Sequence, residues 1–293
     1  MKLNETKSLI YQWASSLKTS HSSSAAIDVA TIMESLLERL IEEYDEGLNE
    51  DAFFTVSNKE YNVVMNAYRK STFFREQERQ QKQYRQRQRQ HRRQVKYGII
   101  DGYGDGYDDD HDENEAKNVE HEGIIKLEAL LQRMKDRYEN YKTIFDETST
   151  STNTNQDDGR LPPKPDIYTF NTLLSAYSHQ FRNEKAVQKA EDIIKMLESS
   201  TFDDEKNATI FVKPDTVSYN VLMNIFANQV GEYGYAQKAE DVLLNMSKMR
   251  KEGSDTIVPD TTSFNIVLKA WKNSGGGSIE CKYYKNSDYL CSI

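Results

Sequence analysis

Asparagine recurs at one position of a short phrase that the chain repeats four times. In each copy it directly follows an aromatic residue, and a second aromatic residue comes six positions later; the four are Asn62, Asn171, Asn220 and Asn265. Three copies begin with Pro-Asp, which supplies Asp166, Asp215 and Asp260. An amide offers a donor and an acceptor to the edge of a base, whereas an ionised aspartate only accepts and is better suited to orient the asparagine or a water molecule.

A local structural role explains the same residues. Asparagine at this position can cap a helix or bridge the backbones of two helices, and aspartate after proline is a common N-cap. From these residues alone, base recognition and helix capping are both open.

The phrase itself has the pattern of a helix, since Phe170, Leu173, Leu174 and Tyr177 fall on one helical face. We expect both aromatic residues of every copy to lie in the core. A second amphipathic stretch follows each of the first three copies, at 127–134, 190–197 and 239–246. Proline precedes three of the first helices and separates one unit from the next. Repetition at intervals of tens of residues predicts an array of stacked helix-turn-helix units.

The order Pro-Asp-x-x-(Thr/Ser)-(Phe/Tyr)-Asn-x-Leu-(Leu/Met), followed by Ala-Glu-Asp-(Ile/Val)-(Ile/Leu)-x-x-Met, resembles the pentatricopeptide repeat family. The resemblance is strong over 160–272, moderate over 57–70 and 121–140, and weak over 6–47. It implies an all-α fold, a right-handed α-solenoid of helix-turn-helix repeats. The spacing is longer than usual for this family, and we assign the excess to loops, where insertions cost little free energy.

The predicted organisation follows from the copies. It comprises a degenerate repeat at 1–48, a repeat at 57–140 interrupted by a low-complexity insert at about 75–118, repeats at 165–213 and 214–258, a partial repeat at 259–272 and an irregular tail at 273–293. The partial repeat lacks a second helix, which suggests a truncated or misjoined C-terminus or a short cap.

The resemblance implies sequence-selective binding of single-stranded RNA, one base per repeat, in organellar RNA processing, stability or translation. The implied pairs are Asn62 with Asp166, Asn171 with Asp215 and Asn220 with Asp260, while Asn265 lacks an identifiable partner. In the family this pair favours uracil, so a U-rich target is expected. The residues three positions before each asparagine, which by resemblance pack against base faces, are Lys59, Tyr168, Val217 and Thr262.

The insert has two parts of opposite charge. Residues 75–96 are rich in arginine and glutamine, and residues 101–115 are mostly aspartate, glycine and glutamate. Neither part has the apolar content to pack, so we expect no fixed tertiary packing here, although the first part can be helical. The first part is either a tether for the RNA backbone or a solvated extension, paired or not with the acidic part.

The composition limits other functions. A net charge of −9 is unusual for a general nucleic-acid binder and favours the alternative of a helical scaffold that binds proteins. The sequence predicts no membrane span, enzyme activity, small-molecule substrate, cofactor or metal site, including at the acidic run 108–113. The resemblance implies a mitochondrion or plastid, but the N-terminal sequence is not typical of a targeting peptide.

Overall fold

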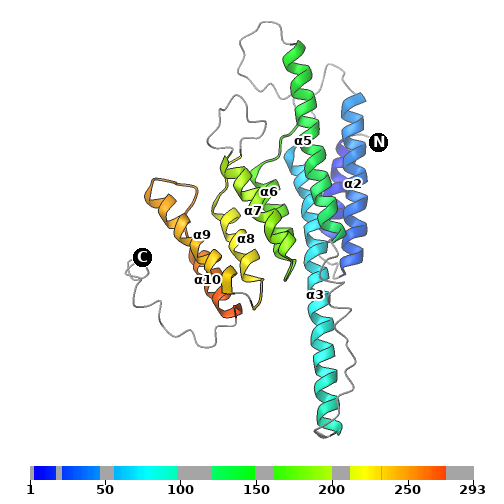
Figure 1. The fold of residues 1–293 in the computed structure, drawn as a ribbon. Coiled ribbons are helices and arrows are strands. Elements are labelled where there is room, and N and C mark those ends of the chain that lie inside the picture. Colours follow the sequence, from blue (N-terminus) through cyan, green and yellow to red (C-terminus); the bar gives the residue numbers. More distant parts are fainter. Residues whose placement is uncertain are drawn as a thin grey trace. The chain divides into compact units, whose positions relative to one another are not determined.

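The computed structural model describes residues 3–17, 22–46, 56–97, 121–148, 162–199, 212–231 and 233–274. Within these ranges every regular element is an α-helix, which confirms the all-α prediction (Figure 1). The helices are α1 (Leu3–Ser16), α2 (Ser23–Glu46), α3 (Asn58–Tyr97), α5 (Glu122–Thr148), α6 (Ile167–Ser178), α7 (Glu184–Ser199), α8 (Thr216–Ala227), α9 (Tyr233–Lys251) and α10 (Thr261–Asn273).

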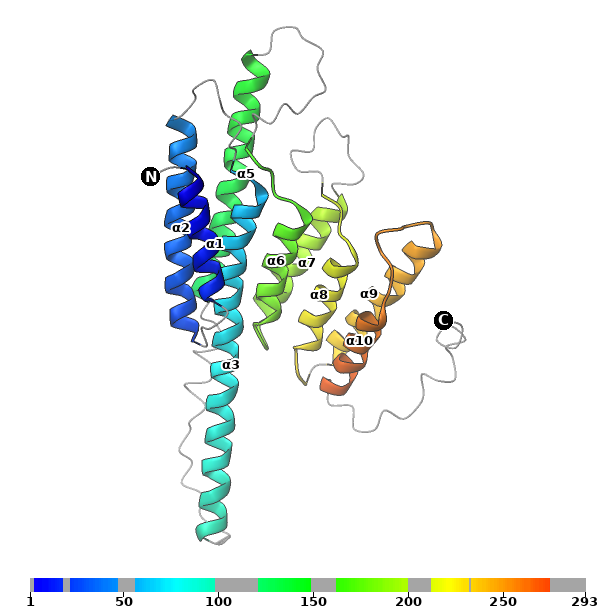
Figure 2. The same cartoon turned by 180° about the vertical axis from the view of Figure 1, so that it is seen from behind.

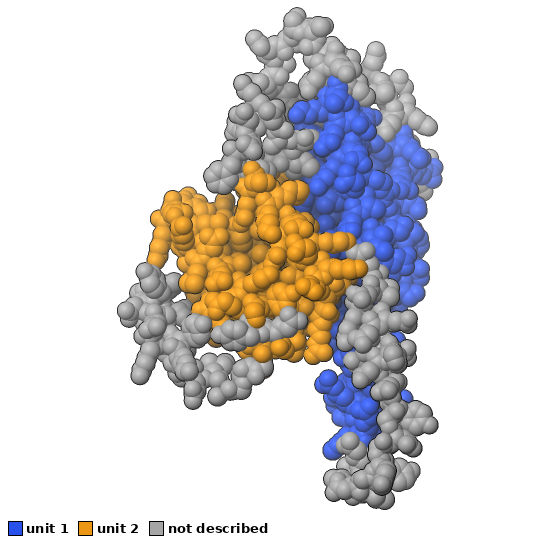
Figure 3. Space-filling model, in the orientation of Figure 1, with its two compact units in different colours: residues 1–179, 204–211 blue, residues 180–203, 212–293 orange. Residues whose placement is uncertain are grey.

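The chain divides into two compact units, which Figure 3 colours separately. Unit 1 comprises residues 1–179 and 204–211 and contains α1 to α6, whereas unit 2 comprises residues 180–203 and 212–293 and contains α7 to α10. The division falls inside the repeat predicted at 165–213. The boundaries of the compact units do not test the boundaries of the sequence repeats, which stay predictions.

In unit 1 each helix packs on its neighbours in the chain order. Helix α1 packs on α2 and α3, α2 on α3, α3 on α5 and α6, and α5 on α6 (Figures 1 and 2). The core between them consists of side chains from the apolar stripes, among them the fully buried Ile10, Met33, Leu37, Met65 and Leu127. Helical periodicity therefore determines which face of each helix turns inward.

Helix α3 is much longer than the first helix predicted from the phrase. It continues through the arginine- and glutamine-rich part of the insert because this stretch contains neither glycine nor proline and consists of good helix formers. Its buried face ends at Thr72, and from Phe73 to Arg92 no side chain is buried. The C-terminal half of α3 extends beyond the ends of α2 and α5 in both views (Figures 1 and 2). The acidic part of the insert, 101–115, lies outside the described residues.

In unit 2, α7 packs on α8, α8 packs on α9 and α10, and α9 packs on α10. The predicted core aromatics Tyr219 and Phe226 are buried, as are Tyr61, Tyr68, Phe170 and Tyr177 in unit 1. Phe264 and Trp271 were expected in the core too, and this expectation was wrong: both are half-buried. They belong to α10, which among the described helices of unit 2 contacts only α8 and α9.

The first helices begin where the prolines predict. Asp166, Asp215 and Asp260 are the N-caps of α6, α8 and α10, and each carboxylate accepts a hydrogen bond from the backbone N–H three residues later. A hydroxyl at that third position accepts in return from the N-cap N–H, so each start is a reciprocal capping box. The capping role of these aspartates is therefore confirmed.

Buried tyrosine–glutamate hydrogen bonds join second helices to the first helix of the following pair. Tyr68 of α3 donates to Glu34 of α2, Tyr177 of α6 donates to Glu128 of α5, and in unit 2 Tyr219 of α8 donates to Glu198 of α7 at 2.7 Å. Burial, reinforced by the bond to the carboxylate, raises the pKa of Tyr68 and of Tyr219 well above the usual value.

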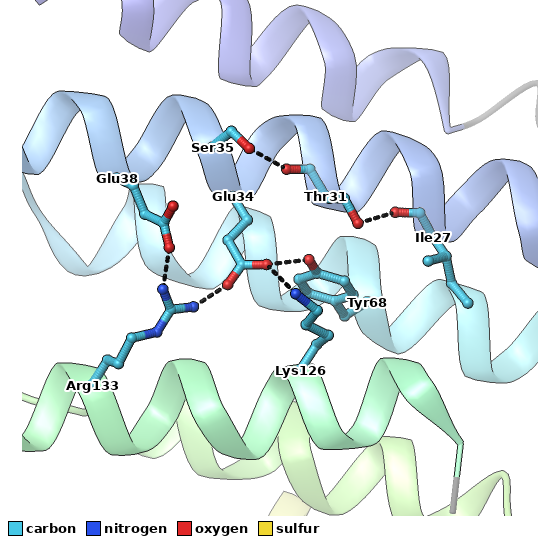
Figure 4. A network of polar contacts seen from close by, with 8 residues as sticks. All are labelled: Ile27, Thr31, Glu34, Ser35, Glu38, Tyr68, Lys126 and Arg133. Carbon is cyan, nitrogen blue, oxygen red and sulfur yellow. Dashed lines mark hydrogen bonds and ion pairs between the residues drawn. The ribbon is translucent and has the colours of Figure 1, made fainter.

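Glu34 is the centre of the largest such network (Figure 4). Besides Tyr68, its carboxylate is paired with Arg133 and lies 3.6 Å from the ammonium of Lys126, both on α5, while Arg133 also contacts Glu38. Three helices thus meet at one buried carboxylate whose charge is balanced locally, which avoids the cost of an unpaired buried ion.

Candidate functional site

In unit 1 the start of α6 meets the asparagine of α3. The amide nitrogen of Asn62 lies 3.4 Å from both carboxylate oxygens of Asp166, and the amide oxygen lies 2.9 Å from the hydroxyl of Thr169. The Thr169 hydroxyl also lies 2.7 Å from Asp166, so asparagine, N-cap and capping-box hydroxyl form one cluster.

Unit 2 repeats the same cluster with different residues. The amide nitrogen of Asn220 in α8 donates to Asp260 at 3.3 Å, and the hydroxyl of Ser263 donates to the amide oxygen of Asn220 at 2.7 Å. Hydrogen bonds from Ser263, together with those from Asn220 and Thr262, lower the pKa of Asp260, which is therefore ionised at neutral pH and acts as an acceptor. Two of the predicted asparagine–aspartate pairs are thus in contact.

The third predicted pair is divided between the units. Asn171 is half-buried in unit 1, and Asp215 lies in unit 2, so their pairing stays a prediction. Asn265, which lacked a partner in the sequence, is exposed on α10.

The asparagines that form the clusters are buried. Asn62 is 9% exposed and Asn220 is 8% exposed. Asn220 therefore does not face solvent, which is the condition under which its replacement would leave fold stability nearly unchanged. Its amide bridges two successive first helices, which gives it a structural role whatever else it contacts.

The positions three residues before each asparagine lie on the surface instead. Tyr168 is 54% exposed and Val217 is 52% exposed, and Lys59 and Thr262 are also exposed. Each belongs to the first turn of a first helix, beside the N-cap. At two of these four positions, those of Tyr168 and Val217, an apolar side chain is therefore exposed near a helix start.

The first helices carry few acidic residues. Helices α6, α8 and α10 contain no acidic residue, and the acidic residue of α3 nearest to Asn62, Glu60, is buried. Asn66 and Asn224 lie one helical turn after the clustered asparagines. Arg69 donates to Asn66 at 2.8 Å, and Lys269 donates to Asn224 at 2.8 Å. The negative net charge of the chain therefore lies elsewhere.

The hydroxyl member of each cluster, Thr169 or Ser263, was not assigned a role from the sequence. The available signal was the recurrence of threonine or serine three residues after the aspartate. In the first phrase Glu60 occupies this position, where it accepts from Ser57 and, at 3.0 Å, from Tyr11 of α1. Burial alone would raise the pKa of Glu60, but the bonds from Ser57, the Lys7 charge and the Tyr11 bond outweigh it and lower the pKa.

Other chemistry is not assembled in the described part of the chain. No group of three His, Cys, Asp or Glu side chains there is arranged to hold a metal ion. No described helix combines the length and apolar character needed to cross a bilayer. The acidic run 108–113 and both cysteines lie outside the described residues.

Comparisons with known proteins give no independent family assignment. No protein-family model matches the chain, and no curated protein matches it significantly.

Proposed function

We propose that the chain is a pentatricopeptide-type α-solenoid that binds single-stranded RNA along its first helices. The recurrence of the asparagine–aspartate–hydroxyl cluster in both units carries this proposal. The clusters occur at the positions that the family resemblance assigns to base recognition. Since a carboxamide has two N–H groups and two lone pairs, the cluster contacts leave one of each for the edge of a base.

The surroundings of the clusters fit an RNA strand. Tyr168 and Val217 are exposed beside the helix starts and suit contact with base faces, which tolerate any aromatic or apolar platform. Beyond their N-cap aspartates, α6, α8 and α10 carry no acidic side chain that would repel phosphates. The resemblance favours uracil at these positions and a role in RNA processing, stability or translation in a mitochondrion or plastid.

The experiment compares the affinity of the chain for oligo-U, oligo-A and oligo-C over a series of salt concentrations. We expect the tightest binding to oligo-U. Tyr168→Ala removes an exposed ring and should weaken binding by about 1–3 kcal/mol, the usual contribution of one stacked base. Ile125→Ala is the matched control, because Ile125 is 49% exposed on the second helix α5. Equal affinities of the two variants would reject the proposed face.

A scaffold that binds proteins is the second candidate. Helix α10 favours it, because Leu268 is 57% exposed there beside the half-buried Phe264 and Trp271. Phosphate contacts are strongest at low salt. If the chain binds none of the three oligonucleotides there, the protein-binding scaffold becomes the favoured function.

A further inference from the structure

The C-terminal half of α3 concentrates positive charge where none of the described side chains is buried. From Arg79 to Arg92 the sequence contains six arginine or lysine residues and no acidic residue. The last acidic side chains before it are engaged: Glu76 pairs with Arg79 at 2.9 Å, and Glu78 accepts from the backbone of Ser23 at 2.9 Å.

Four of these cations form one stripe. Lys82, Arg85, Arg89 and Arg92 are separated by three or four residues, the spacing that places side chains on one face of a helix. All four are exposed, and none forms an ion pair with another described residue. At 1.5 Å per residue the stripe is about 15 Å long. We call these four residues the basic stripe.

An exposed aromatic ring lies on the same helix, on the other side from the basic stripe. Tyr84 is 65% exposed, and Arg87 lies three positions further along the same helix, hence beside it on the helix surface. Exposed aromatic rings next to arginines suit stacking on bases, which an acidic polypeptide does not offer. Together with the charge of the basic stripe, this exposed Tyr84–Arg87 pair favours a nucleic acid over an acidic polypeptide as the partner of this part of α3.

We propose that the basic stripe contacts the phosphate backbone of the same RNA molecule outside the segment that the repeats recognise. The inference rests on the proposed function for the identity of the RNA. It adds a contact that does not depend on base sequence. The stripe holds the strand by charge, while the clusters of the first helices select the bases.

The test replaces all four residues of the basic stripe by glutamine in the full chain, because glutamine keeps the helix propensity. The substitutions are Lys82→Gln, Arg85→Gln, Arg89→Gln and Arg92→Gln. The matched control replaces four exposed lysines of α7 and α9: Lys185, Lys195, Lys248 and Lys251, each by glutamine. Both variants have the same net charge, so any difference between them is local. Affinity for oligo-U and oligo-A of about twenty nucleotides is measured from low to high salt.

The stripe variant should bind both oligonucleotides at least tenfold more weakly at low salt. The slope of log affinity against log salt should flatten by about 0.7 for each lost phosphate contact, or roughly three for the whole stripe. The control should keep the slope of the parent chain. The ratio between oligo-U and oligo-A affinities should be the same in all three proteins.

Equal slopes in the stripe and control variants would overturn the proposal while leaving base selection by the repeats intact. If the stripe variant has a flatter salt dependence but the parent chain does not prefer oligo-U, the phosphate contact is supported and the proposed base selectivity is rejected. The thermal midpoint completes the test. If it falls by several degrees in the stripe variant but not in the control, the stripe serves a partner within the chain, and its assignment to RNA is wrong.

Discussion

Asn62 and Asn220 stabilise the fold at the positions that we propose for the recognition of bases. Each is buried and joins the N-cap of the following first helix through its amide. The family resemblance implied which aspartate each of these two asparagines would meet. It did not predict the burial, which depends on the hydroxyl that closes the cluster and on how closely successive helices approach.

Replacing Asn220 by alanine should therefore destabilise unit 2. The change leaves the hydroxyl of Ser263 and the carboxylate of Asp260 without this partner, and we expect a loss of about 1–3 kcal/mol in the free energy of unfolding. Asn265→Ala is the matched control on exposed α10 and should change stability by less than about 0.5 kcal/mol. Urea unfolding measures both, and equal losses would show that the amide of Asn220 contributes nothing to folding.

Two histidines of unit 1, the buried His121 and the half-buried His179, predict a dependence of stability on pH. Burial lowers the pKa of His121 to about 4, assisted by the charge of Arg75, and burial lowers the pKa of His179 to about 4, assisted by Arg69 and His121. His121 also accepts the backbone N–H of Gly123 at 2.8 Å, a bond that protonation at this nitrogen would remove. Between pH 6.5 and about 4 the unfolded chain binds more protons than the folded one, so stability falls as the pH falls through this window.

For His121 the linkage amounts to about 2 kcal/mol between pH 7.5 and pH 5. His121→Asn keeps an acceptor for Gly123 but does not titrate, so its loss of stability over this range should be smaller than that of the parent by about this amount. His91→Asn, at an exposed position of α3, should behave like the parent. Urea unfolding at the two pH values gives the comparison, and a parent and His121→Asn that lose equal stability would refute the assignment.

At the scale of elements, repetition and proline placement located the helices well. The starts of α6, α8 and α10 follow Pro165, Pro214 and Pro259, because proline separates the units and aspartate caps the helix. The length of α3 was not predicted, since a stretch without an apolar face has no periodicity to indicate a helix. The tyrosine–glutamate bonds were not predicted either, because they join different helices and leave no pattern within one of them.

The cost of losing an aromatic residue should depend on its neighbours rather than on its place in the phrase. Phe170 is fully buried, and Phe170→Ala should cost roughly 3–5 kcal/mol through the cavity that it leaves. Phe264 occupies the same position of the phrase on α10 but is half-buried, so Phe264→Ala should cost less than half as much. Chemical denaturation of both variants tests this order, and equal costs would mean that α10 is covered as fully as α6.

At the scale of the whole molecule, the negative net charge and the proposed anionic partner are compatible because the charges are segregated. The first helix of each pair is positive or neutral in total, and the second helices α2, α5, α7 and α9 carry most of the acidic residues of the described helices. The sequence showed the acidic blocks but could not show that α6, α8 and α10 lack acid on every face. Knowing this required the bounds of the helices.

The central claim is that RNA lies along the first helices and not along the second ones. Val217→Glu places a negative charge at an exposed position of α8, and Leu244→Glu places the same charge at an exposed position of the second helix α9. The two side chains are 52% and 58% exposed, so neither change should affect folding. The decisive measurement is the affinity of both variants for oligo-U at low salt. The account predicts that Val217→Glu binds at least about tenfold more weakly, or 1.4 kcal/mol, while Leu244→Glu binds like the parent. Equal affinities, or a loss confined to Leu244→Glu, would contradict it.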